Sequence, residues 1–266
     1  MEPPAEGPAS APAVPRALGL VRGRTAVVTA AAGTGIGGAT ARRFLEEGAR
    51  VLISDRHERR LAQAHAELAA EFGAAAVAAR RCDVTAEDDV TALFAAADRH
   101  FGGVDIAVNN AGLGGTTPLS EMTDDQWGRV IDVTLTGTMR CTRAALRAMA
   151  GRGGAIVNNA SVVAWRAQYG QAHYAAAKAG VLALTRCAAV EAAPHGIRVN
   201  AVAPSLADHP HLAAVTSPGL LAELARREAF GRSAHPWEVA NVIVFLASDY
   251  SSYMTGEAVS VSSQRA

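Results

Sequence analysis

Three residues in the middle of the chain have types and a spacing that suit acid–base chemistry at one oxygen atom. Tyr174 and Lys178 are four residues apart, and the alanines between them favour a helix. Residues i and i+4 lie on the same face of a helix, so the phenol and the ammonium point into the same space. Ser161 follows an apolar run, Ala155 to Val157, which predicts a buried strand. A hydroxyl at the end of that strand and a Tyr/Lys pair on the next helix can converge on one substrate oxygen.

This set suits the removal of a proton and a hydride from a secondary alcohol. A free tyrosine has a pKa of about 10, so the neutral phenol is a poor base. Lowering the pKa of Tyr174 by about 3 requires about 4 kcal/mol, which we expect from the Lys178 ammonium together with a cationic nicotinamide ring. The phenolate would then take the proton of the alcohol, and Ser161 would hydrogen-bond the oxygen and hold it in line.

A glycine-rich turn near the N-terminus predicts the site for that nicotinamide cofactor. The apolar run Thr25–Thr29 leads into the turn at residues 30–37, which is followed by a helix through about Glu47. A second strand, Val51–Ser54, ends at Asp55. Strand, glycine-rich turn, helix, strand and acid form the dinucleotide-binding fingerprint, in which backbone N–H groups at a helix N-terminus bind the pyrophosphate. The turn alone would be weak support, since tight turns use glycine anyway.

Asp55 favours NAD over NADP. It falls about 20 residues after the turn, where an acid accepts hydrogen bonds from ribose hydroxyls and repels a 2′-phosphate. Two other interpretations stay open. The neighbouring Arg56 could bind a 2′-phosphate, and Asp55 could simply cap the helix that follows it.

The rest of the chain alternates expected strands and helices, which predicts a single α/β domain with a Rossmann fold and a doubly wound parallel sheet. Ligands of such sheets bind at the carboxyl ends of the strands. Residues 1–20 are rich in Pro and Ala and are expected to be a disordered tail, so that residues 21–266 form the catalytic domain. A single helix, with a bend near Gly137, is expected over residues 124–150.

Composition argues against several other classes of protein. The chain has 266 residues, of which half are apolar, and its formal net charge is zero, so nothing indicates a nucleic-acid or membrane partner. No apolar run approaches the ~20 residues that span a bilayer, and the N-terminus lacks the apolar segment of a signal peptide. The three cysteines have no metal-ligand spacing. We expect reduced thiols in a cytoplasmic protein without a metal site, the alternative being one reactive cysteine.

Taken together, the motifs resemble the short-chain dehydrogenase/reductase family from about Arg22 to Val261. They comprise the glycine-rich turn, Asp83-Val84, Asn109-Asn110-Ala111-Gly112, Ser161, Tyr174-x-x-x-Lys178 and Asn200-Ala201-Val202-Ala203-Pro204. Their order and spacing together are highly specific. The resemblance implies a homotetrameric or homodimeric oxidoreductase in which Ser161, Tyr174 and Lys178 are catalytic.

The resemblance also implies a set of cofactor-binding residues, with Asp83 and Val84 beside the adenine. The set comprises Thr29, Gly33, Thr34, Gly35, Ile36, Gly37, Asp55, Arg56, Asp83, Val84, Asn110, Ala111, Gly112, Tyr174, Lys178, Pro204 and Ser205.

Four positions depart from the family pattern. Ala30 stands where the family usually has glycine, and because alanine resists positive φ the turn is expected to be built differently. Thr134 stands where the family often has a catalytic asparagine, and its hydroxyl could still hold a proton-relay water. Ser205 replaces the glycine that usually follows Pro204, and His209 lies near the place of a threonine that meets the carboxamide.

In several of these departures the sequence resembles one branch of the family, the dehydrogenases of bacterial steroid breakdown. The stretches Thr29–Gly37, Asn158–Tyr174 and Asp249–Tyr253 carry this resemblance. Those enzymes oxidise a ring hydroxyl on the bicyclic remnant of the steroid, carried as a coenzyme A thioester, so a cyclic acyl-CoA substrate is implied. The near alternative is an NADPH-dependent reductase of 3-oxoacyl thioesters. The altered turn, Thr134 and Ser205 leave a non-catalytic dinucleotide sensor as a minor alternative.

The substrate pocket is expected between residues 113–118, residues 162–171 and a mobile lid at residues 206–228. His173 is expected to point away from the site, because adjacent helical residues do not share a face. Trp165 could equally be a packing aromatic, and His209 a surface residue. The expected substrate contacts are Ser161, Val163, Trp165, Gln171, Tyr174 and His209.

Overall fold

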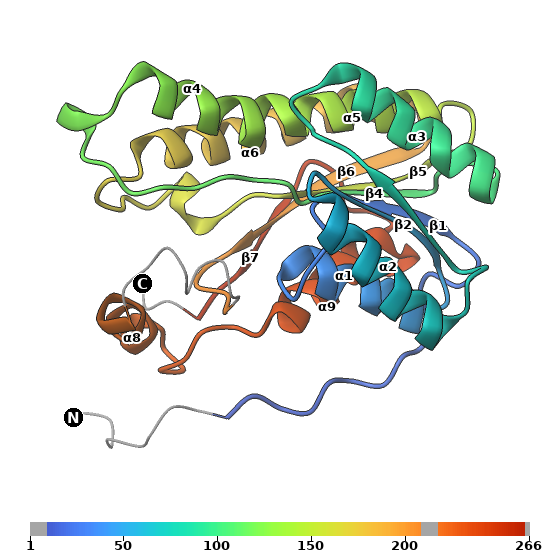
Figure 1. Cartoon of the computed structure of the whole chain (residues 1–266), viewed down its shortest axis with the longest axis horizontal. Coiled ribbons are helices and arrows are strands. Elements are labelled where there is room, and N and C mark those ends of the chain that lie inside the picture. The colour runs from blue at the N-terminus through green and yellow to red at the C-terminus, as the bar shows by residue number, and fades with distance from the viewer. Residues whose placement is uncertain (1–9, 209–217, 264–266) are drawn as a thin grey trace.

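The computed structural model describes residues 10–208 and 218–263, which fold around one parallel sheet (Figure 1). The sheet has seven strands in the order β3-β2-β1-β4-β5-β6-β7, so the predicted doubly wound parallel sheet is confirmed. The strands are β1 (Thr25–Val28), β2 (Arg50–Asp55), β3 (Val77–Arg81), β4 (Ile106–Asn109), β5 (Gly154–Asn159), β6 (Ile197–Pro204) and β7 (Ala258–Val261).

Helices cover both faces of the sheet, which is why the central strands read as continuous apolar runs. In Figure 1, one layer below the sheet holds α1 (Ile36–Glu46), α2 (Glu58–Phe72) and α9 (Pro236–Ala247). The layer above holds α3 (Glu87–Phe101), α4 (Asp124–Ile131), α5 (Gly137–Met149) and α6 (Ala172–Ala192), while α8 (Pro218–Arg227) stands apart from both. Short helical turns lie at Leu119–Glu121, Val162–Ala164, Ala193–His195 and Asp249–Ser251.

The strand register brings the chemically interesting segments to one edge of the sheet. Asn109 of β4 pairs with Asn158 of β5, which pairs with Ala201 of β6. Because all strands run in the same direction, the segments after β1, β4, β5 and β6 leave the sheet at its carboxyl edge. The glycine-rich turn, residues 110–112, Ser161 and Pro204 therefore lie at the same edge.

The helix expected over residues 124–150 is interrupted in the structure. α4 ends at Ile131, Asp132–Thr136 form a π-helical segment, and α5 begins at Gly137. Gly137 is required where the helix passes Val84, because a Cβ atom there would lie 2.7 Å from Val84 Cγ2. A π-helical segment inserts an extra residue into the helical turn, so it changes which side chains face the sheet. The predicted bend near Gly137 thus corresponds to a widened turn just before it.

The end of the Pro/Ala-rich segment is held against α1. The guanidinium of Arg43 donates to the carbonyl oxygens of residues 15 and 16, and the Glu47 carboxylate accepts from the N–H groups of residues 18 and 20. Arg43 and Glu47 also pair at 2.7 Å, and Glu47 is fully buried. A buried carboxylate needs such donors. The disorder expected over residues 1–20 therefore differs from the structure at residues 15–20, and residues 1–9 lie outside the described part.

We expect Glu47→Ala to lower the free energy of unfolding by about 3 kcal/mol, since it leaves the buried Arg43 guanidinium without its main partner. Urea unfolding of the two proteins measures the difference. Glu46 also pairs with Arg43, at 2.9 Å, but its side chain is 30% exposed. The matched control Glu46→Ala should therefore lose less than about 1 kcal/mol. Equal losses in the two variants would show that Glu47 does not anchor the N-terminal segment.

Candidate active site

The glycine-rich turn has a positive backbone angle φ at Ala30, where the sequence was expected to avoid one. Ala30 has φ of +51°, in the left-handed region, which disfavours alanine by roughly 1 kcal/mol. The Asn110 side chain holds it there, since its Nδ2 donates to the carbonyl oxygens of Thr29 (3.1 Å) and Ala30 (3.2 Å). The expectation that alanine would avoid a positive φ at this position is therefore wrong: tertiary hydrogen bonds hold the conformation.

The turn and the start of α1 fit the pyrophosphate of a dinucleotide. A Cβ atom at Gly37 would collide with the Ala30 carbonyl oxygen, and one at Gly38 with the Gly33 carbonyl oxygen, so the backbone segments approach as closely as they can. The N-cap residue Gly35 has no side chain to cap the helix, and the first turn of α1 contains no acid. The N–H groups there remain available to an anion at the positive end of the helix dipole.

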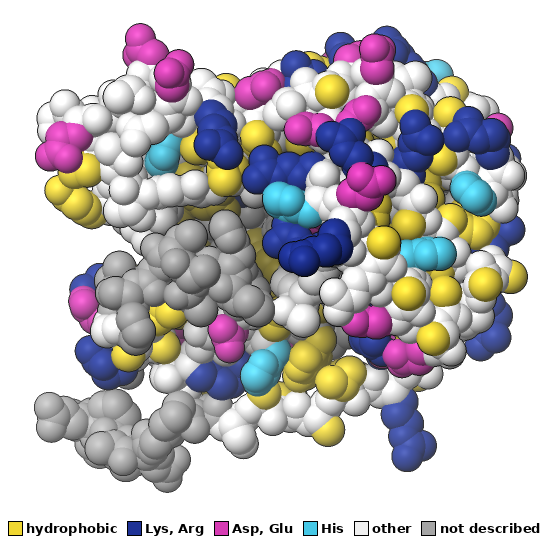
Figure 2. Space-filling model, in the orientation of Figure 1, with side chains coloured by type: hydrophobic (Ala, Val, Ile, Leu, Met, Phe, Trp, Pro, Cys, Tyr) yellow, Lys and Arg dark blue, Asp and Glu magenta, His cyan; other side chains and the backbone are white. Residues whose placement is uncertain are grey.

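A cleft of about 760 Å³ brings most of the expected cofactor residues together. Figure 2 shows a hollow on this face, beside the grey residues, with Lys, Arg and His side chains gathered along one rim. The expected residues that line the cleft are Gly33, Thr34, Gly35, Ile36, Gly37, Asp55, Arg56, Asp83, Val84, Asn110, Ala111, Gly112, Tyr174 and Lys178.

Thr29 takes part in the site from beneath the cleft. Its side chain is buried, and its hydroxyl oxygen accepts hydrogen bonds from the N–H groups of Asn110 (2.9 Å) and Ala111 (3.1 Å). It thus ties the segment after β4 to the end of β1. Thr29 supports the walls of the cleft rather than lining it.

Acidic and basic side chains meet at the end of the cleft that leads away from Tyr174. Asp55 Oδ1 accepts the N–H of His57 at 2.9 Å and lies 3.8 Å from the Arg60 guanidinium. The interpretation of Asp55 as a helix N-cap is therefore wrong: His57 is the N-cap of α2, and Asp55 lines the cleft. Burial opposes ionisation of Asp83, but two hydrogen bonds from Thr85 and nearby arginines outweigh it and lower the pKa of Asp83.

Ser161, Tyr174 and Lys178 converge at the other end of the cleft. Ser161 follows β5, and its hydroxyl hydrogen-bonds the phenol of Tyr174. Lys178 is buried, its Nζ lies 5.5 Å from the centre of the Tyr174 ring, and it donates to the backbone oxygen of Asn159. The spacing of Tyr174 and Lys178 on α6 therefore brings the phenol and the ammonium together, as the sequence predicted.

In the absence of a bound cofactor, burial disfavours the charged form of both members of this pair. Burial raises the pKa of Tyr174 to about 12, and the Ser161 hydrogen bond offsets only part of that rise. Burial also lowers the pKa of Lys178 to about 8. In the protein by itself the phenol is neutral at neutral pH, because burial disfavours its charged form more than the Ser161 hydrogen bond favours it. A further positive charge in the cleft would favour the phenolate of Tyr174.

Thr134 adjoins the site, but its hydroxyl is occupied by the backbone. Its Oγ1 accepts from the N–H of Leu113 (2.9 Å) and donates to the carbonyl oxygen of Leu113 (3.0 Å). Its own carbonyl oxygen accepts from the Thr138 hydroxyl at 2.7 Å. The single hydroxyl proton is already used, so Thr134 cannot also donate to a relay water. Thr134 positions the loop after Gly112.

Only some of the expected substrate contacts line the cleft. Gln171, at the start of α6, lines the cleft. Val163 is buried and its N–H donates to Ser161 Oγ at 3.4 Å. Trp165 is 47% exposed and is not among the described residues that line the cleft. His209 lies outside the described residues.

Part of the expected lid is a helix. Of residues 206–228, the stretch 209–217 lies outside the described part, and Pro218–Arg227 form α8.

His173 does not line the cleft, in keeping with its expected direction, but it is buried behind Gly115: a Cβ atom on Gly115 would lie 3.2 Å from His173 Nε2. Burial also lowers the pKa of His173.

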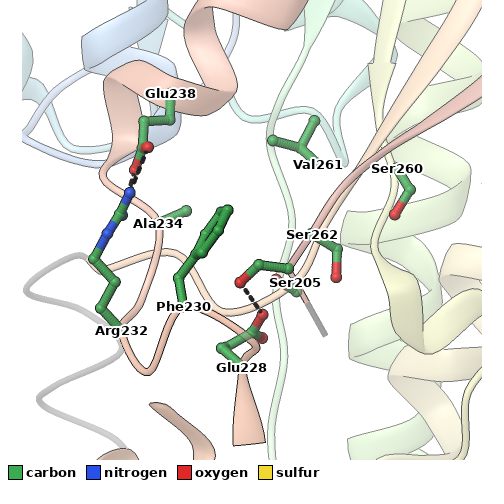
Figure 3. A pocket seen from close by; sticks show the side chains of 10 residues that line it. Ser205, Glu228, Phe230, Arg232, Ala234, Glu238, Ser260, Val261 and Ser262 are labelled. Atoms are coloured by element: carbon green, nitrogen blue, oxygen red, sulfur yellow. Dashed lines mark hydrogen bonds and ion pairs between the residues drawn. The ribbon is translucent and has the colours of Figure 1, made fainter. Parts of the chain in front are cut away.

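Ser205 faces a second cavity of about 270 Å³ (Figure 3). Figure 3 shows the ring of Phe230 between the Arg232–Glu238 ion pair, which is 2.7 Å long, and Ser205. Ser205 therefore does not join the cofactor cleft, and neither does Pro204, whose carbonyl oxygen accepts from Ser161 Oγ at 3.4 Å. The glycine-to-serine departure thus alters the wall of a neighbouring cavity.

Sequence reasoning missed several residues of the cleft. His57 and Arg60 follow the acid at the end of β2, and Cys82 precedes Asp83. Burial raises the pKa of Cys82 to about 12, so its thiol is not a nucleophile. Asn159, the last residue of β5, also lines the cleft. Its position at a strand end on the ligand-binding edge was the available signal.

The described residues hold no group of three or more His, Cys, Asp or Glu side chains that could bind a metal ion. Within the same part of the chain, no helix has the length and apolar character needed to cross a membrane.

The comparisons with known proteins agree with this geometry. A family model described as enoyl-(acyl carrier protein) reductase matches residues 30–263. A crystal structure of a short chain dehydrogenase from Mycobacterium smegmatis is 56% identical, with a TM-score of 0.85, and the match covers 97% of this chain and 99% of that one. The chain belongs to the short-chain dehydrogenase/reductase family. It is therefore an oxidoreductase that acts on CH–OH groups with a nicotinamide dinucleotide.

Two curated relatives indicate the branch of the family to which this short-chain dehydrogenase/reductase is similar. One, from Mycobacterium tuberculosis, is named (5R,7aS)-5-hydroxy-7a-methyl-1-oxo-2,3,5,6,7,7a-hexahydro-1H-indene-carboxyl-CoA reductase; it is 61% identical over 92% of this chain and 94% of its own length. The other is a cis-4-hydroxycyclohexanecarboxylate dehydrogenase from Sinomonas cyclohexanicum, 47% identical over 90% and 94%. The resemblance to enzymes of a bicyclic coenzyme A thioester, drawn from the sequence, is confirmed.

We expect Ala30→Gly to raise the free energy of unfolding by about 1 kcal/mol, since glycine adopts positive φ without the strain that alanine has. Thermal or urea unfolding measures the change. Ala32→Gly, in the same turn but without a positive φ, should lower stability by about 0.5–1 kcal/mol. If both variants are destabilised alike, Ala30 is not strained.

Thr134→Val should raise KM for the substrate and lower stability by about 1–2 kcal/mol, while kcat falls less than tenfold, because the variant leaves the Leu113 backbone groups unpaired. Thr134→Ser keeps the hydroxyl and should restore both properties. Steady-state kinetics and urea unfolding provide the data. A loss of kcat of about a hundredfold with unchanged stability would instead indicate a proton relay through Thr134.

Proposed function

We propose that this enzyme oxidises a secondary ring alcohol of a cyclic acyl-CoA to a ketone, with NAD as the hydride acceptor. The convergence of Ser161, Tyr174 and Lys178 at one end of the dinucleotide cleft carries the reaction type. The substrate class is supported by the two curated relatives, whose names each place a hydroxyl on a carbocycle that bears a carboxyl-derived group. The Mycobacterium tuberculosis relative is named a reductase, so the same chemistry in the reverse direction is part of the proposal.

The residues of the chain divide the proton chemistry between them. When bound, the dinucleotide supplies the hydride acceptor. Ser161 hydrogen-bonds the substrate oxygen, and Tyr174 takes its proton during oxidation or donates one during reduction. Lys178 stays protonated below its pKa of about 8, and it provides a nearby positive charge that favours the phenolate. In reduction the neutral phenol, the form favoured by burial, is the proton donor.

The choice of NAD rests on Asp55. Its carboxylate lines the cleft about where the adenosine ribose of a dinucleotide lies in this fold, and a 2′-phosphate would meet its charge. Arg56 and Arg60 line the same end, and they are the observation that favours the second candidate, NADPH-dependent reduction of a 3-oxoacyl thioester. We also propose that the enzyme is cytoplasmic and that it assembles as a homotetramer or homodimer. Light scattering of the purified protein tests the oligomeric state.

A substrate panel tests this assignment. Initial rates of NAD⁺ and NADP⁺ reduction should be measured with a bicyclic hydroxy-acyl-CoA, a linear 3-hydroxyacyl-CoA and a free cyclic alcohol. We expect the highest kcat/KM for the bicyclic thioester with NAD⁺. A preference for the linear thioester with NADP⁺ would replace our assignment by the second candidate.

Tyr174→Phe should lower kcat by at least a hundredfold and leave NADH affinity within about threefold of the wild-type value, because it removes the proton-transfer group and keeps the ring. Fluorescence titration with NADH and steady-state kinetics give the two numbers. Retention of full activity would remove Tyr174 from the mechanism. Activity that requires Tyr174 excludes the non-catalytic sensor.

A further inference from the structure

His173 is a buried titratable side chain beside Tyr174, and the chemistry described above does not use it. It is the second residue of α6, it is 2% exposed, and it does not line the cleft. A polar ring that is buried to this degree requires partners for its nitrogen atoms. Each nitrogen of His173 lies against a different element that builds the active site.

The first nitrogen caps the start of α6. The N–H of Ala175 donates to the carbonyl oxygen of Gln171 at 2.8 Å, whereas the N–H of Tyr174, one residue earlier, has no acceptor within the helix. Gln171 is the N-cap, and its side chain makes no capping hydrogen bond. Instead, His173 Nδ1 accepts the N–H of Tyr174 at 2.9 Å. The imidazole therefore holds the backbone that carries the phenol.

The second nitrogen faces the wall of the cleft. A Cβ atom on Gly115 would lie 3.2 Å from His173 Nε2, and one on Gly114 would lie 3.8 Å from Tyr174 Cδ2. Gly114 and Gly115 both line the cleft. The loop after β4 therefore packs against two adjacent residues of α6, and the ring of His173 supports this loop from behind.

The ring suits this place only in its neutral form. An Nδ1 atom that accepts a hydrogen bond carries no proton, so the proton of the neutral ring is on Nε2. A protonated ring would lose the acceptor and would put positive charge at the N-terminus of α6, where the helix dipole disfavours it. Burial lowers the pKa of His173, although a hydrogen bond with the backbone of Gln171 opposes this change. The contribution of His173 is therefore geometric.

We propose that His173 is a positioning residue with two separable contacts. Its Nδ1 holds the backbone of Tyr174 so that the phenol stays beside Ser161, and its Nε2 end keeps Gly115 in place in the wall of the cleft. The first contact acts on proton transfer, and the second acts on the space in which the alcohol binds. The inference rests on the proton-transfer role proposed above for Tyr174, and it is independent of the choice between NAD and NADP.

Two amide substitutions separate the contacts. Asparagine places an acceptor oxygen near the position of Nδ1 and nothing at Nε2, whereas glutamine reaches toward Nε2 and leaves Nδ1 without a substitute. His173→Gln should lower kcat about tenfold and leave KM for the alcohol within about twofold, because Tyr174 loses its cap. His173→Asn should keep kcat within about threefold and raise KM about fivefold, because Gly115 loses its support. Steady-state kinetics with the most active alcohol of the substrate panel give both numbers.

NADH binding and a second histidine provide the controls. Fluorescence titration should give NADH dissociation constants within about twofold of the wild-type value for both variants, since His173 does not line the cleft. His65→Gln is the matched control, because His65 is also partly buried and its Nε2 contacts a backbone oxygen, that of Val77 at 3.3 Å, but it lies in α2. This variant should keep wild-type kcat and KM.

Equal kcat values for His173→Gln and His173→Asn would overturn the proposal, and so would a loss of NADH affinity that matches the loss of kcat. If His173→Gln fails to fold, His173→Ala takes its place, and its kcat should be about tenfold below that of His173→Asn at a similar KM. Failure of the proposed function is a separate outcome, which Tyr174→Phe decides: full activity of that variant would remove the phenol from the mechanism whatever the His173 variants do.

Discussion

The active site depends on two ionisable side chains on one turn of α6, Tyr174 in the wall of the cleft and the buried Lys178. Burial disfavours charge on both, which raises the pKa of the phenol to about 12 and lowers that of the ammonium to about 8. The lysine is kept in place by the carbonyl oxygen of Asn159, and the phenol by the hydroxyl of Ser161. Asn159 is the last residue of β5 and Ser161 lies two residues after it, so the end of this strand positions both side chains of the helix. Positive charge that enters such a site favours the phenolate.

A second set of contacts connects this pair to the dinucleotide turn. Thr29 and Asn110 hold the backbone between β1 and β4, and Asn110 keeps Ala30 at its positive φ. Asn159 continues the series from Asn110 to Lys178. Hydrogen bonds of this kind cross three adjacent strands of the sheet at one edge. They place the pyrophosphate-binding turn and the proton-transfer residues in one rigid unit, which suits a reaction that requires close alignment of cofactor and substrate.

The sequence predicted what depends on local spacing. The i, i+4 pair on α6, the serine after a buried strand, and the alternation of strands and helices all have short-range signals, and the structure shows them at the expected places. Prediction from the sequence failed where a distant contact overrides a local conformational preference. Ala30 is strained because Asn110, 80 residues away, binds its carbonyl oxygen. No pattern in residues 15–20 reveals that the buried carboxylate of Glu47 needs their N–H groups.

Side-chain direction was the other source of error. Thr134 lies at the expected place, within the π-helical segment, but its hydroxyl donates to the carbonyl oxygen of Leu113 and accepts from the N–H of the same residue. Ser205 follows the expected proline and yet faces a separate cavity. In each case the residue type was read correctly, while the backbone path that aims the side chain depends on tertiary packing.

The measurement that tests this account most directly is the ionisation of Tyr174 with and without oxidised cofactor. The ultraviolet absorbance of tyrosinate should be titrated against pH in the wild type and in Tyr174→Phe, and the difference between them assigned to Tyr174. We predict that the protein alone shows no ionisation of Tyr174 below about pH 11, as burial requires, and that saturation with NAD⁺, but not with NADH, lowers the pKa by at least 2. Ionisation near pH 10 in the protein alone, or titration curves unaffected by NAD⁺, would contradict the central claim that burial keeps the phenol neutral until positive charge enters the cleft.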